Sequence, residues 1–263
     1  MILYINNGVK CVLPIKNGEK AMGRLFATLS GKGGVGKSSF CVMLARALKR
    51  HGKVLLIDMD TGLSCLDLML KVDDRVVFNL NDILNGEREV SEVAIHCEDN
   101  LDLIAAPEEK PESKALRNFL FNITEEYDFV IADFPAGKNT ELLNGMPLFC
   151  EFLVVSKPDP VSLRDAEILS GDISGEYLSK RLIINSFILK DMQKAKGIAR
   201  FSIDDIIDKT KTRLLGIIPY EKEVAVLQSG RTLKNKSRAQ KSVERITLRI
   251  LGRRMPLPNL KKI

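Results

Sequence analysis

The sequence predicts an α/β fold with a mostly parallel, twisted sheet and helices on both of its faces. Seven short apolar segments recur along the chain without polar alternation, which is typical of strands buried on both sides. Helical segments lie between them, so that successive strands can run parallel through helical crossovers. With 263 residues, 45% of them hydrophobic, the chain is long enough to bury a full core.

Local patterns place the elements in chain order. The predicted strands are residues 24–30, 53–58, 100–106, 127–133, 151–156, 181–185 and 214–219. The first strand leads through a glycine-rich loop into a helix at 38–52, which Gly52 ends. Further helices are predicted at 112–127, 159–173 and 237–252.

These elements form one predicted domain, residues 22–252, between two flanking segments. Residues 1–21 are interpreted as an N-terminal extension, in which residues 2–5 and 9–15 could pair as a hairpin around Asn6-Asn7-Gly8. We assign no function to this extension. Residues 253–263 form a basic tail, and no repeat or linker interrupts the domain.

The composition excludes several classes of protein. No run of about 18 apolar residues is present, so no transmembrane helix is expected, and the start lacks the apolar region of a signal peptide. The histidines, His51 and His96, lie near no nucleophile or second ligand, which argues against a zinc site or a histidine triad. Five scattered cysteines, without CxxC spacing, are typical of small core residues in the reducing cytoplasm: Cys11, Cys41, Cys65, Cys97 and Cys150.

The loop at Gly31–Ser38 matches the phosphate-binding pattern GxxxxGK[ST]. It follows a strand and opens a helix, which is the context that this motif requires. The glycines let backbone N–H groups close around phosphate oxygens, and the helix N-terminus adds its positive end. Lys37 is then expected to reach the terminal phosphates, and the Ser38 hydroxyl is expected to lie near Mg²⁺.

Acidic residues follow two of the predicted strands. Asp58 and Asp60 end one strand two residues apart, so in an extended chain they would project to the same side. Asp133 ends another strand, at the position expected of a Walker-B acid. The carboxyl edge of such a sheet is where ligands bind, so we expect the three acids to lie near the metal and the attacking water.

These residues resemble the MinD/ParA family of P-loop ATPases, over about residues 22–252. The deviant loop of that family, KGGxGK[ST], is present as Lys32-Gly33-Gly34-Val35-Gly36-Lys37-Ser38. Further matches are residues 58–67, 133–137 and 216–224, with Asn185 at a strand end. The resemblance implies the SIMIBI type of P-loop NTPase fold, ATP and Mg²⁺ as cofactors, and ATP hydrolysis.

The resemblance also implies a role for each matching residue. Lys37 and Asp60 are implied in catalysis, Asp60 by orienting the attacking water, while Ser38, Asp58 and Asp133 belong at the metal. The nucleotide would be held by Gly33, Gly34, Val35, Gly36, Lys37, Ser38, Ser39, Asn185 and Pro219. Lys32 matches the lysine that reaches the phosphates of a partner subunit, which implies an ATP-dependent homodimer; alternatively, it is an ordinary loop lysine in solvent.

Several residues depart from the family pattern. Serines stand at 38 and 39 where threonines are usual, and Phe134, Lys138 and Asn139 change the segment after the switch acid. These departures bear on the rate of hydrolysis and on the activating partner, more than on ATP binding.

The C-terminal end of the chain is strongly basic. Residues 231–263 hold eleven Lys and Arg against the single acid Glu244, a net charge of +10, so residues 1–230 carry −4 of the total of +6. In the last helix, Arg238, Lys241, Arg245 and Arg249 form a basic stripe beside an apolar one at Ala239, Val243, Ile246 and Ile250. This helix could dock on the domain with a solvated basic face, or present that face to anionic lipid or DNA.

Four functional hypotheses stay open. The resemblance favours the MinD branch: a cytoplasmic switch that positions the division site by cycling on and off the membrane, with an activating or cargo protein of the MinE or MinC type. Pro256 and Pro258 forbid the amphipathic helix with which MinD relatives end. The alternatives within the family are a ParA-like partitioning ATPase on non-specific DNA and a regulator of flagellar number. A nucleotide-dependent scaffold without useful turnover belongs to a different class.

Overall fold

The computed structural model describes residues 2–6, 9–13, 22–62, 65–173, 177, 179–188, 203–231, 233 and 237–257. Eight strands form one sheet in the order β10-β9-β8-β3-β7-β4-β6-β5. Their bounds are β3 (Arg24–Leu29), β4 (Val54–Asp58), β5 (Ile95–Glu98), β6 (Leu101–Ile104), β7 (Phe129–Asp133), β8 (Glu151–Ser156), β9 (Ser179–Phe187) and β10 (Arg213–Pro219). All neighbours run parallel except β5 and β6, so the predicted α/β fold with a mostly parallel sheet is confirmed.

The seven predicted strands are present, and most of their bounds differ from the prediction by one or two residues. Strand β5 was not predicted, because only Ile95 of its four residues is buried and the segment lacks the apolar run of the others. A separate two-stranded sheet pairs β1 (Ile2–Asn6) with β2 (Val9–Leu13) antiparallel, which confirms the predicted hairpin. Its turn at residues 7–8 lies outside the described residues.

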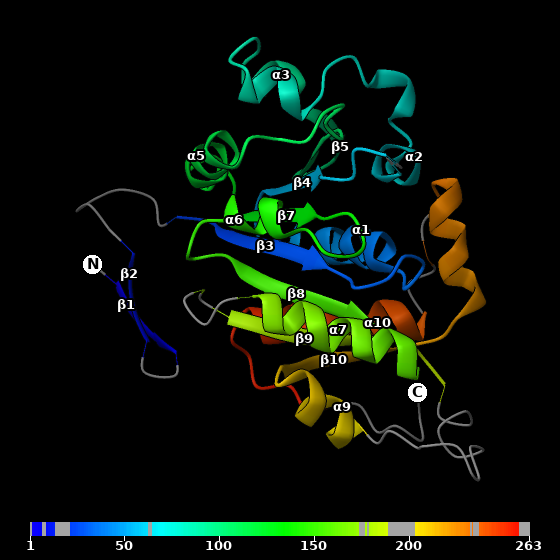
Figure 1. Ribbon diagram of the computed structural model, residues 1–263. Helices are drawn as coiled ribbons and strands as arrows, with labels where there is room; N and C mark the ends of the chain where they lie inside the picture. The colour runs from blue at the N-terminus through cyan, green and yellow to red at the C-terminus, as the bar shows by residue number, and fades with distance from the viewer. Residues whose placement is uncertain are drawn as a thin grey trace.

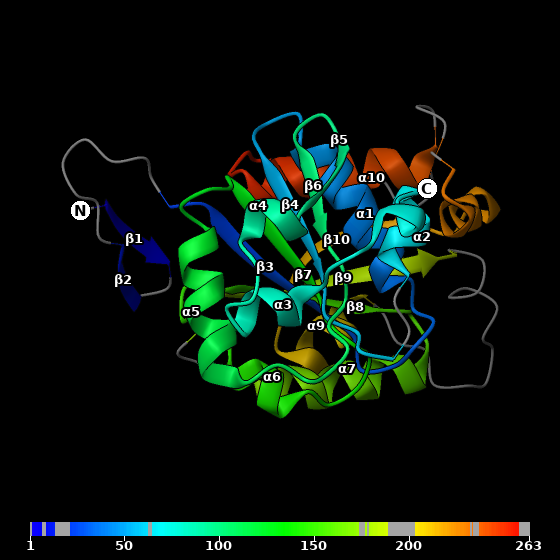
Figure 2. The same ribbon diagram turned by 90° about the horizontal axis from the view of Figure 1, so that it is seen from above.

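Helices cover both faces of the sheet (Figures 1 and 2). One face carries α1 (Lys37–Leu48), α2 (Leu66–Leu70) and α10 (Arg238–Ile250). The opposite face carries α3 (Leu80–Leu84), α4 (Val90–Val93), α5 (Ser113–Ile123), α6 (Thr140–Asn144), α7 (Pro160–Asp172) and α9 (Ile203–Thr210). Two 3₁₀ helices in the described part of the chain, η1 (Asp73–Arg75) and η2 (Lys222–Ser229), both contact α2.

Alternate residues of each central strand enter opposite cores. In β3, Phe26 packs under α1, whereas Leu25 and Ala27 pack on the side of α5 and α7. Side chains of a strand alternate between faces, so a strand inside such a sheet must be apolar at every position. This requirement explains the absence of polar alternation in the sequence. Thr28 follows Phe26 by two residues in β3, so its side chain also points to the face that α1 covers.

The apolar stripe of the last helix is buried, as the docked interpretation expects. Ala239, Val243, Ile246 and Ile250 of α10 are at most 3% exposed and pack against β10 and α1. Of the basic stripe, Arg249 is not available to a ligand, because its guanidinium donates to the carbonyls of Leu215 and Met255. The other three basic side chains of the stripe are exposed.

A cluster of charged residues joins the amino ends of three strands. Glu151 at the start of β8 is nearly buried, and its carboxylate accepts hydrogen bonds from Arg24 of β3 and Arg181 of β9. Arg24 also donates to the carbonyl of Ile250, where α10 ends. The edge of the sheet opposite the glycine-rich loop is therefore held by one acid between two arginines.

Replacing that acid should destabilise the protein. In Glu151→Gln the two arginines would lose their shared counter-charge in a partly buried place, which we expect to lower the free energy of unfolding by about 2–3 kcal/mol. The matched control is Glu244→Gln, which breaks the exposed ion pair with Arg50 and should cost less than about 1 kcal/mol. Urea denaturation measures both; equal losses would contradict a structural role for the cluster.

Candidate nucleotide-binding site

The glycine-rich loop lies between β3 and α1. At two of its positions a neighbouring residue leaves no room for a Cβ atom, so glycine is required there. A Cβ at Gly31 would lie 2.5 Å from Cβ of Asp165, and one at Gly36 would lie 2.4 Å from Nδ2 of Asn185. Gly36 also has a positive φ of 86°, which favours glycine. Gly33 and Gly34, in contrast, are exposed with open space around them, so their backbone remains accessible to a ligand.

Asn185 fixes the base of the loop. This residue of β9 is buried, and its Nδ2 donates a 2.7 Å hydrogen bond to the carbonyl of Val35. The Val35 side chain is buried beneath the loop. Asn185 therefore has a contact that sequence reasoning did not foresee, while its implied contact with the base of a nucleotide stays a prediction.

Sheet register brings three polar side chains together beneath the loop. Asp133 of β7 pairs with Thr28 of β3 on one side and with Asp58 of β4 on the other. Residues paired in this way point to the same face of a sheet, here the face that α1 covers. The three strands are neighbours, so Thr28, Asp133 and Asp58 form a row at their carboxyl ends.

Lys37, the first residue of α1, is buried against this row. Its Nζ lies 2.5 Å from Oδ1 of Asp133, and both side chains are less than 10% exposed. Burial is the largest single influence and acts to lower the pKa of Lys37, but the charge of Asp133, its hydrogen bond and the other neighbouring groups, Cys41 and Asp58, together outweigh burial, so the pKa is raised. The same Oδ1 atom is also 3.3 Å from Sγ of Cys41.

Asp58 is buried and forms no ion pair with the residues that the structure describes. Its carboxylate accepts hydrogen bonds from the backbone N–H groups of Asp60, Cys65 and Leu66, at 3.0, 3.3 and 3.4 Å. Burial raises its pKa to about 6, with a further contribution from the charge of Asp133, while the hydrogen bonds act in the opposite direction.

Asp60 lies beyond the strand and differs from Asp58 in its surroundings. The chain leaves β4 after Asp58, so the extended geometry that was expected for the pair does not continue. Asp60 is partly exposed, and its Oδ1 accepts a 3.3 Å hydrogen bond from the N–H of Gly62. The two acids thus occupy the same edge of the sheet but not the same environment.

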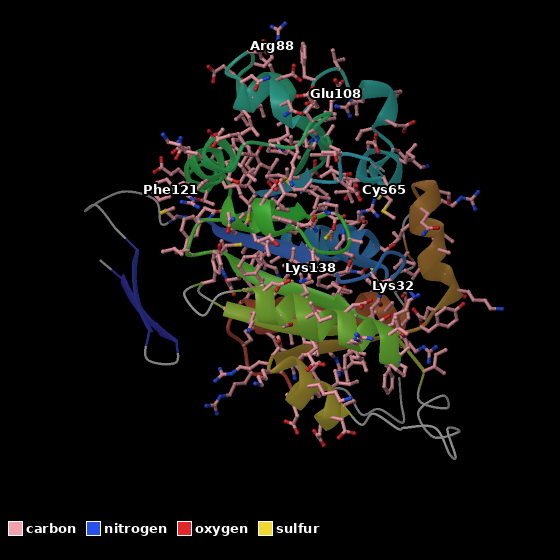
Figure 3. The ribbon with its side chains drawn as sticks, viewed as in Figure 1. Lys32, Cys65, Arg88, Glu108, Phe121 and Lys138 are labelled. Atoms are coloured by element: carbon pink, nitrogen blue, oxygen red, sulfur yellow. The ribbon has the colours of Figure 1, made fainter. Side chains whose placement is uncertain are left out.

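The other predicted residues surround this centre. Ser38 is partly exposed and lies beside Cys65, whereas Ser39 is buried. Lys32 is exposed at the tip of the loop and makes no ion pair with any residue that the structure describes. Figure 3 shows Lys32 and Cys65 at the same edge of the sheet, where the strand arrows of Figure 1 end. Pro219 is buried at the end of β10, in register with Phe187.

The segment after Asp133 is tied to the loop and to itself. The N–H of Gly137 donates a 2.8 Å hydrogen bond to the carbonyl of Ser30. Nδ2 of Asn139 donates to the carbonyls of Pro135 and Gly137, at 2.6 and 3.1 Å. Lys138 pairs with Asp172 of α7 at 3.5 Å. Two departures from the family pattern, Lys138 and Asn139, therefore hold this segment in place.

Phe134, the third departure in this segment, does not face the site. Its side chain is 0% exposed and belongs to the core on the side of α5 and α7. The Phe134 N–H bonds to the carbonyl of Thr28, as the parallel sheet requires. The bulk of this residue is thus taken up by the core.

These residues fit a nucleotide with Mg²⁺. Two buried carboxylates, Asp133 and Asp58, lie side by side, and among the described residues only Asp133 has an ion pair, with Lys37. Mg²⁺ binds through few protein oxygens, with water and phosphate completing its shell, and the Ser38 hydroxyl lies beside them. The open backbone at Gly33 and Gly34 and the start of α1 are suited to phosphate.

Sequence reasoning missed the two thiols of the site. Cys41 was interpreted as a core residue, although its position four residues after Lys37 places both side chains on one face of α1. Cys65 follows the undescribed residues 63–64 and contacts Ser38, a meeting that no spacing in the sequence indicates.

The pKa of Asp58 makes the stability of the nucleotide-free protein depend on pH. Because the folded protein holds this proton more tightly than the unfolded chain, the free energy of unfolding falls by about 3 kcal/mol as the pH rises from below 4 through 6. In Asp58→Asn this contribution is absent. We therefore expect the stability of the variant relative to the wild type to increase between pH 4.5 and pH 7.5 in urea denaturation without Mg²⁺. A difference that stays constant over this range would contradict the buried, poorly compensated carboxylate.

Comparisons with known proteins agree with this geometry. Residues 26–233 match the family model described as the CobQ/CobB/MinD/ParA nucleotide binding domain. The septum site-determining protein MinD of Thermotoga maritima is 31% identical over 251 residues, which cover 90% of this chain and 92% of that protein.

Two solved structures show the same fold. One is in the MinC:MinD cell division protein complex of Aquifex aeolicus, with a TM-score of 0.81 and 27% identity over 90% of this chain and 99% of that one. MinD of Pyrococcus horikoshii, complexed with Mg-ADP, matches with a TM-score of 0.74 and 23% identity, over 87% and 96% of the two chains. With its loop, its row of acids and these matches, the chain belongs to the CobQ/CobB/MinD/ParA family of nucleotide-binding domains.

Proposed function

We propose that this protein is an ATP-hydrolysing switch of the MinD type, which dimerises with ATP and helps to position the division site. The observation that supports it most is the buried arrangement of Lys37 between the glycine-rich loop and Asp133, with Asp58 beside it. A lysine held at the start of a helix, below accessible backbone, is placed to bind the terminal phosphates of a nucleotide.

Each residue of the site has a proposed task. Gly33 to Ser39 wrap the phosphate chain, and Lys37 exchanges Asp133 for the terminal phosphates when ATP binds. Mg²⁺ would neutralise charge on the phosphate oxygens, held near the Ser38 hydroxyl with Asp58 and Asp133 behind it. Asp60, partly exposed after β4, is placed to orient the attacking water. Asn185, near the end of β9, and Pro219, at the end of β10, are proposed to line the site of the nucleotide base.

Lys32 is proposed to act on the ATP of a partner subunit. Its exposure at the loop tip, without an ion pair among the described residues, leaves the ammonium group available to a second copy of the chain. A cation supplied in trans stabilises the transferring phosphoryl group, an effect worth ~10³-fold or more in rate. ATP would then hold the dimer together, and hydrolysis would release it.

The proposed role in the cell is inferred from the relatives to which the chain is similar. The relatives named above are septum site-determining and cell division proteins, and one of them is solved in a complex with MinC. We propose a cytoplasmic protein that recruits a cargo or an activating protein of the MinC or MinE type. No helix in the described part of the chain is both long and apolar enough to cross a membrane.

Membrane association is proposed to be peripheral and electrostatic. Besides Arg249, which is engaged within the fold, the basic end presents Lys241, Arg245, Arg253 and Arg254 as exposed side chains. Each such residue contributes ~1 kcal/mol near an anionic membrane, so a dimer would bind where a monomer leaves. Pro258, Lys261 and Lys262 lie outside the described residues.

A ParA-like partitioning ATPase is the alternative that the same basic side chains favour. Non-specific DNA would also bind these arginines and lysines, with a steep dependence on salt. A regulator of flagellar number would use the same site and would differ from the MinD type in its partner proteins. A scaffold without turnover would also use this site, but its slow release of phosphate would not be raised by lipid or a partner.

Lys32→Ala tests the proposed dimer. We expect the wild type to sediment as a dimer with ATP and as a monomer with ADP or without nucleotide. Without the second amine, the triphosphate is under-neutralised between two copies, so the variant should dimerise at least ten-fold more weakly or hydrolyse ATP at least 100-fold more slowly, roughly. Sedimentation with each nucleotide, together with phosphate release, measures both effects.

The matched control is Lys114→Ala, an exposed lysine of α5 on the opposite face of the sheet, which should behave as the wild type. A Lys32→Ala protein that dimerises and hydrolyses normally would remove the trans-acting lysine from the proposal. Repeating the sedimentation with anionic vesicles and with DNA separates the hypotheses: ATP-dependent retention on vesicles supports the MinD type, and retention on DNA supports the ParA type.

A further inference from the structure

The buried thiol of Cys41 has no task in the proposed function, yet it touches the central acid of the site. Cys41 is 0% exposed, and its Sγ lies 3.3 Å from Oδ1 of Asp133. A sulfur–oxygen distance of this length is a hydrogen-bonding distance for a thiol donor, which is larger than an N–H or O–H group. Cys41 therefore does more at this position than fill space under the sheet.

The helix geometry explains why Cys41 can reach Asp133. Cys41 follows Lys37 by four residues in α1, so the two side chains lie one turn apart on the same face of the helix. Both meet the same oxygen atom, Oδ1, from neighbouring positions. The carboxylate of Asp133 is thus bound by a strong donor, the ammonium group of Lys37, and by a weak one, the thiol of Cys41.

The thiol stays protonated and therefore remains a donor. Burial raises the pKa of Cys41 well above its ordinary value, and the charge of Asp133 raises it further. The Thr28 hydroxyl lies beside Cys41 and is buried, but it has no hydrogen-bond partner of ordinary geometry among the described residues. Thr28 therefore does not replace the thiol as a donor to Asp133.

The two donors must behave differently when a nucleotide binds. Lys37 leaves Asp133 for the phosphates under the proposed function, and a buried carboxylate that lost its partner would be costly to keep in place. The thiol is fixed on the helix one turn away and has no phosphate to move to. We infer that Cys41 is a positioning residue, which holds the Asp133 carboxylate in its orientation toward the metal while Lys37 is engaged by phosphate; this inference rests on the proposed function.

The contact itself can be tested without nucleotide, by infrared spectroscopy of the S–H stretch. The band of Cys41 is identified as the one that Cys41→Ala removes from the spectrum. A hydrogen bond to a carboxylate lowers the frequency of this band, so in Asp133→Asn, which keeps the shape of the side chain, the band should move to higher frequency. A Cys41 band at the same frequency in both proteins would overturn the inference.

The positioning role is tested by titrating Mg²⁺ against equilibrium binding of a fluorescent ATP analogue. Cys41→Ala should raise the Mg²⁺ concentration at half-saturation about five-fold, the factor that one hydrogen bond is worth, while binding without Mg²⁺ stays as in the wild type. Cys41→Ser, which restores a donor, should return the midpoint close to that of the wild type.

Cys150→Ala is the matched control, because Cys150 is also a completely buried thiol but lies before β8, away from the row of acids. It should leave the Mg²⁺ midpoint unchanged even if it lowers stability as much as Cys41→Ala does. Equal midpoints for Cys41→Ala and the wild type, or equal shifts for the two alanine variants, would overturn the positioning role. A wild type that binds no ATP analogue would instead refute the proposed function, and the infrared band would still decide on the contact.

Discussion

The buried ion pair between Lys37 and Asp133 is the interaction on which the arrangement of the site depends. It joins the first residue of α1 to the last residue of β7, across the end of β3. Neither charge could remain there alone, because an unpaired charge in such a place is destabilising by several kcal/mol. The pair therefore fixes where the helix begins relative to the sheet, and with it the height of the glycine-rich loop above the strand ends. The loop can be open and exposed at Gly33 and Gly34 because its base is held by this pair and by the Asn185 bond to Val35.

The register of β3, β7 and β4 places a second buried carboxylate, that of Asp58, beside this ion pair. Asp58 stands beside Asp133 and pairs with no cation among the described residues, and burial, with the charge of Asp133, raises its pKa to about 6 although backbone N–H groups act in the opposite direction. Near neutral pH the corner holds more negative than positive charge, and a divalent cation restores the balance better than a second lysine could, because it also attracts phosphate. The same excess of negative charge that makes the two acids costly to bury would favour the binding of a cation. A site that was neutral without its ligands would have less to gain from them.

Much of the fold could be predicted from the sequence, and the limits of that prediction have physical causes. Unalternated apolar runs identify strands buried on both faces, and the glycine pattern identifies the phosphate loop, because both depend on local chemistry. Asp58 and Asp133 were expected at the same edge of the sheet, but the order of strands does not follow from such runs, so the row in which Thr28, Asp133 and Asp58 are direct neighbours was not predicted. The bond from Asn185 to Val35 joins residues 150 positions apart, and no local pattern reports it. Cys41 was assigned to the core because the cysteines are scattered without CxxC spacing; its contact with Asp133 depends on which face of α1 meets the end of β7.

The same geometry explains how a change at the phosphates could reach a distant surface. Asp133 is followed directly by the segment in which Gly137 bonds to Ser30, so the two loops around the site share a hydrogen bond. Both loops also touch α7: Gly31 packs on Asp165, and Lys138 pairs with Asp172. Asn139 closes the segment on itself by bonding to the carbonyls of Pro135 and Gly137. Under the proposed function Lys37 exchanges a carboxylate for phosphate, which changes the forces on Asp133 and on the segment that follows β7. A displacement of either loop would alter a contact of α7, because Gly31 and Lys138 meet that helix at different residues.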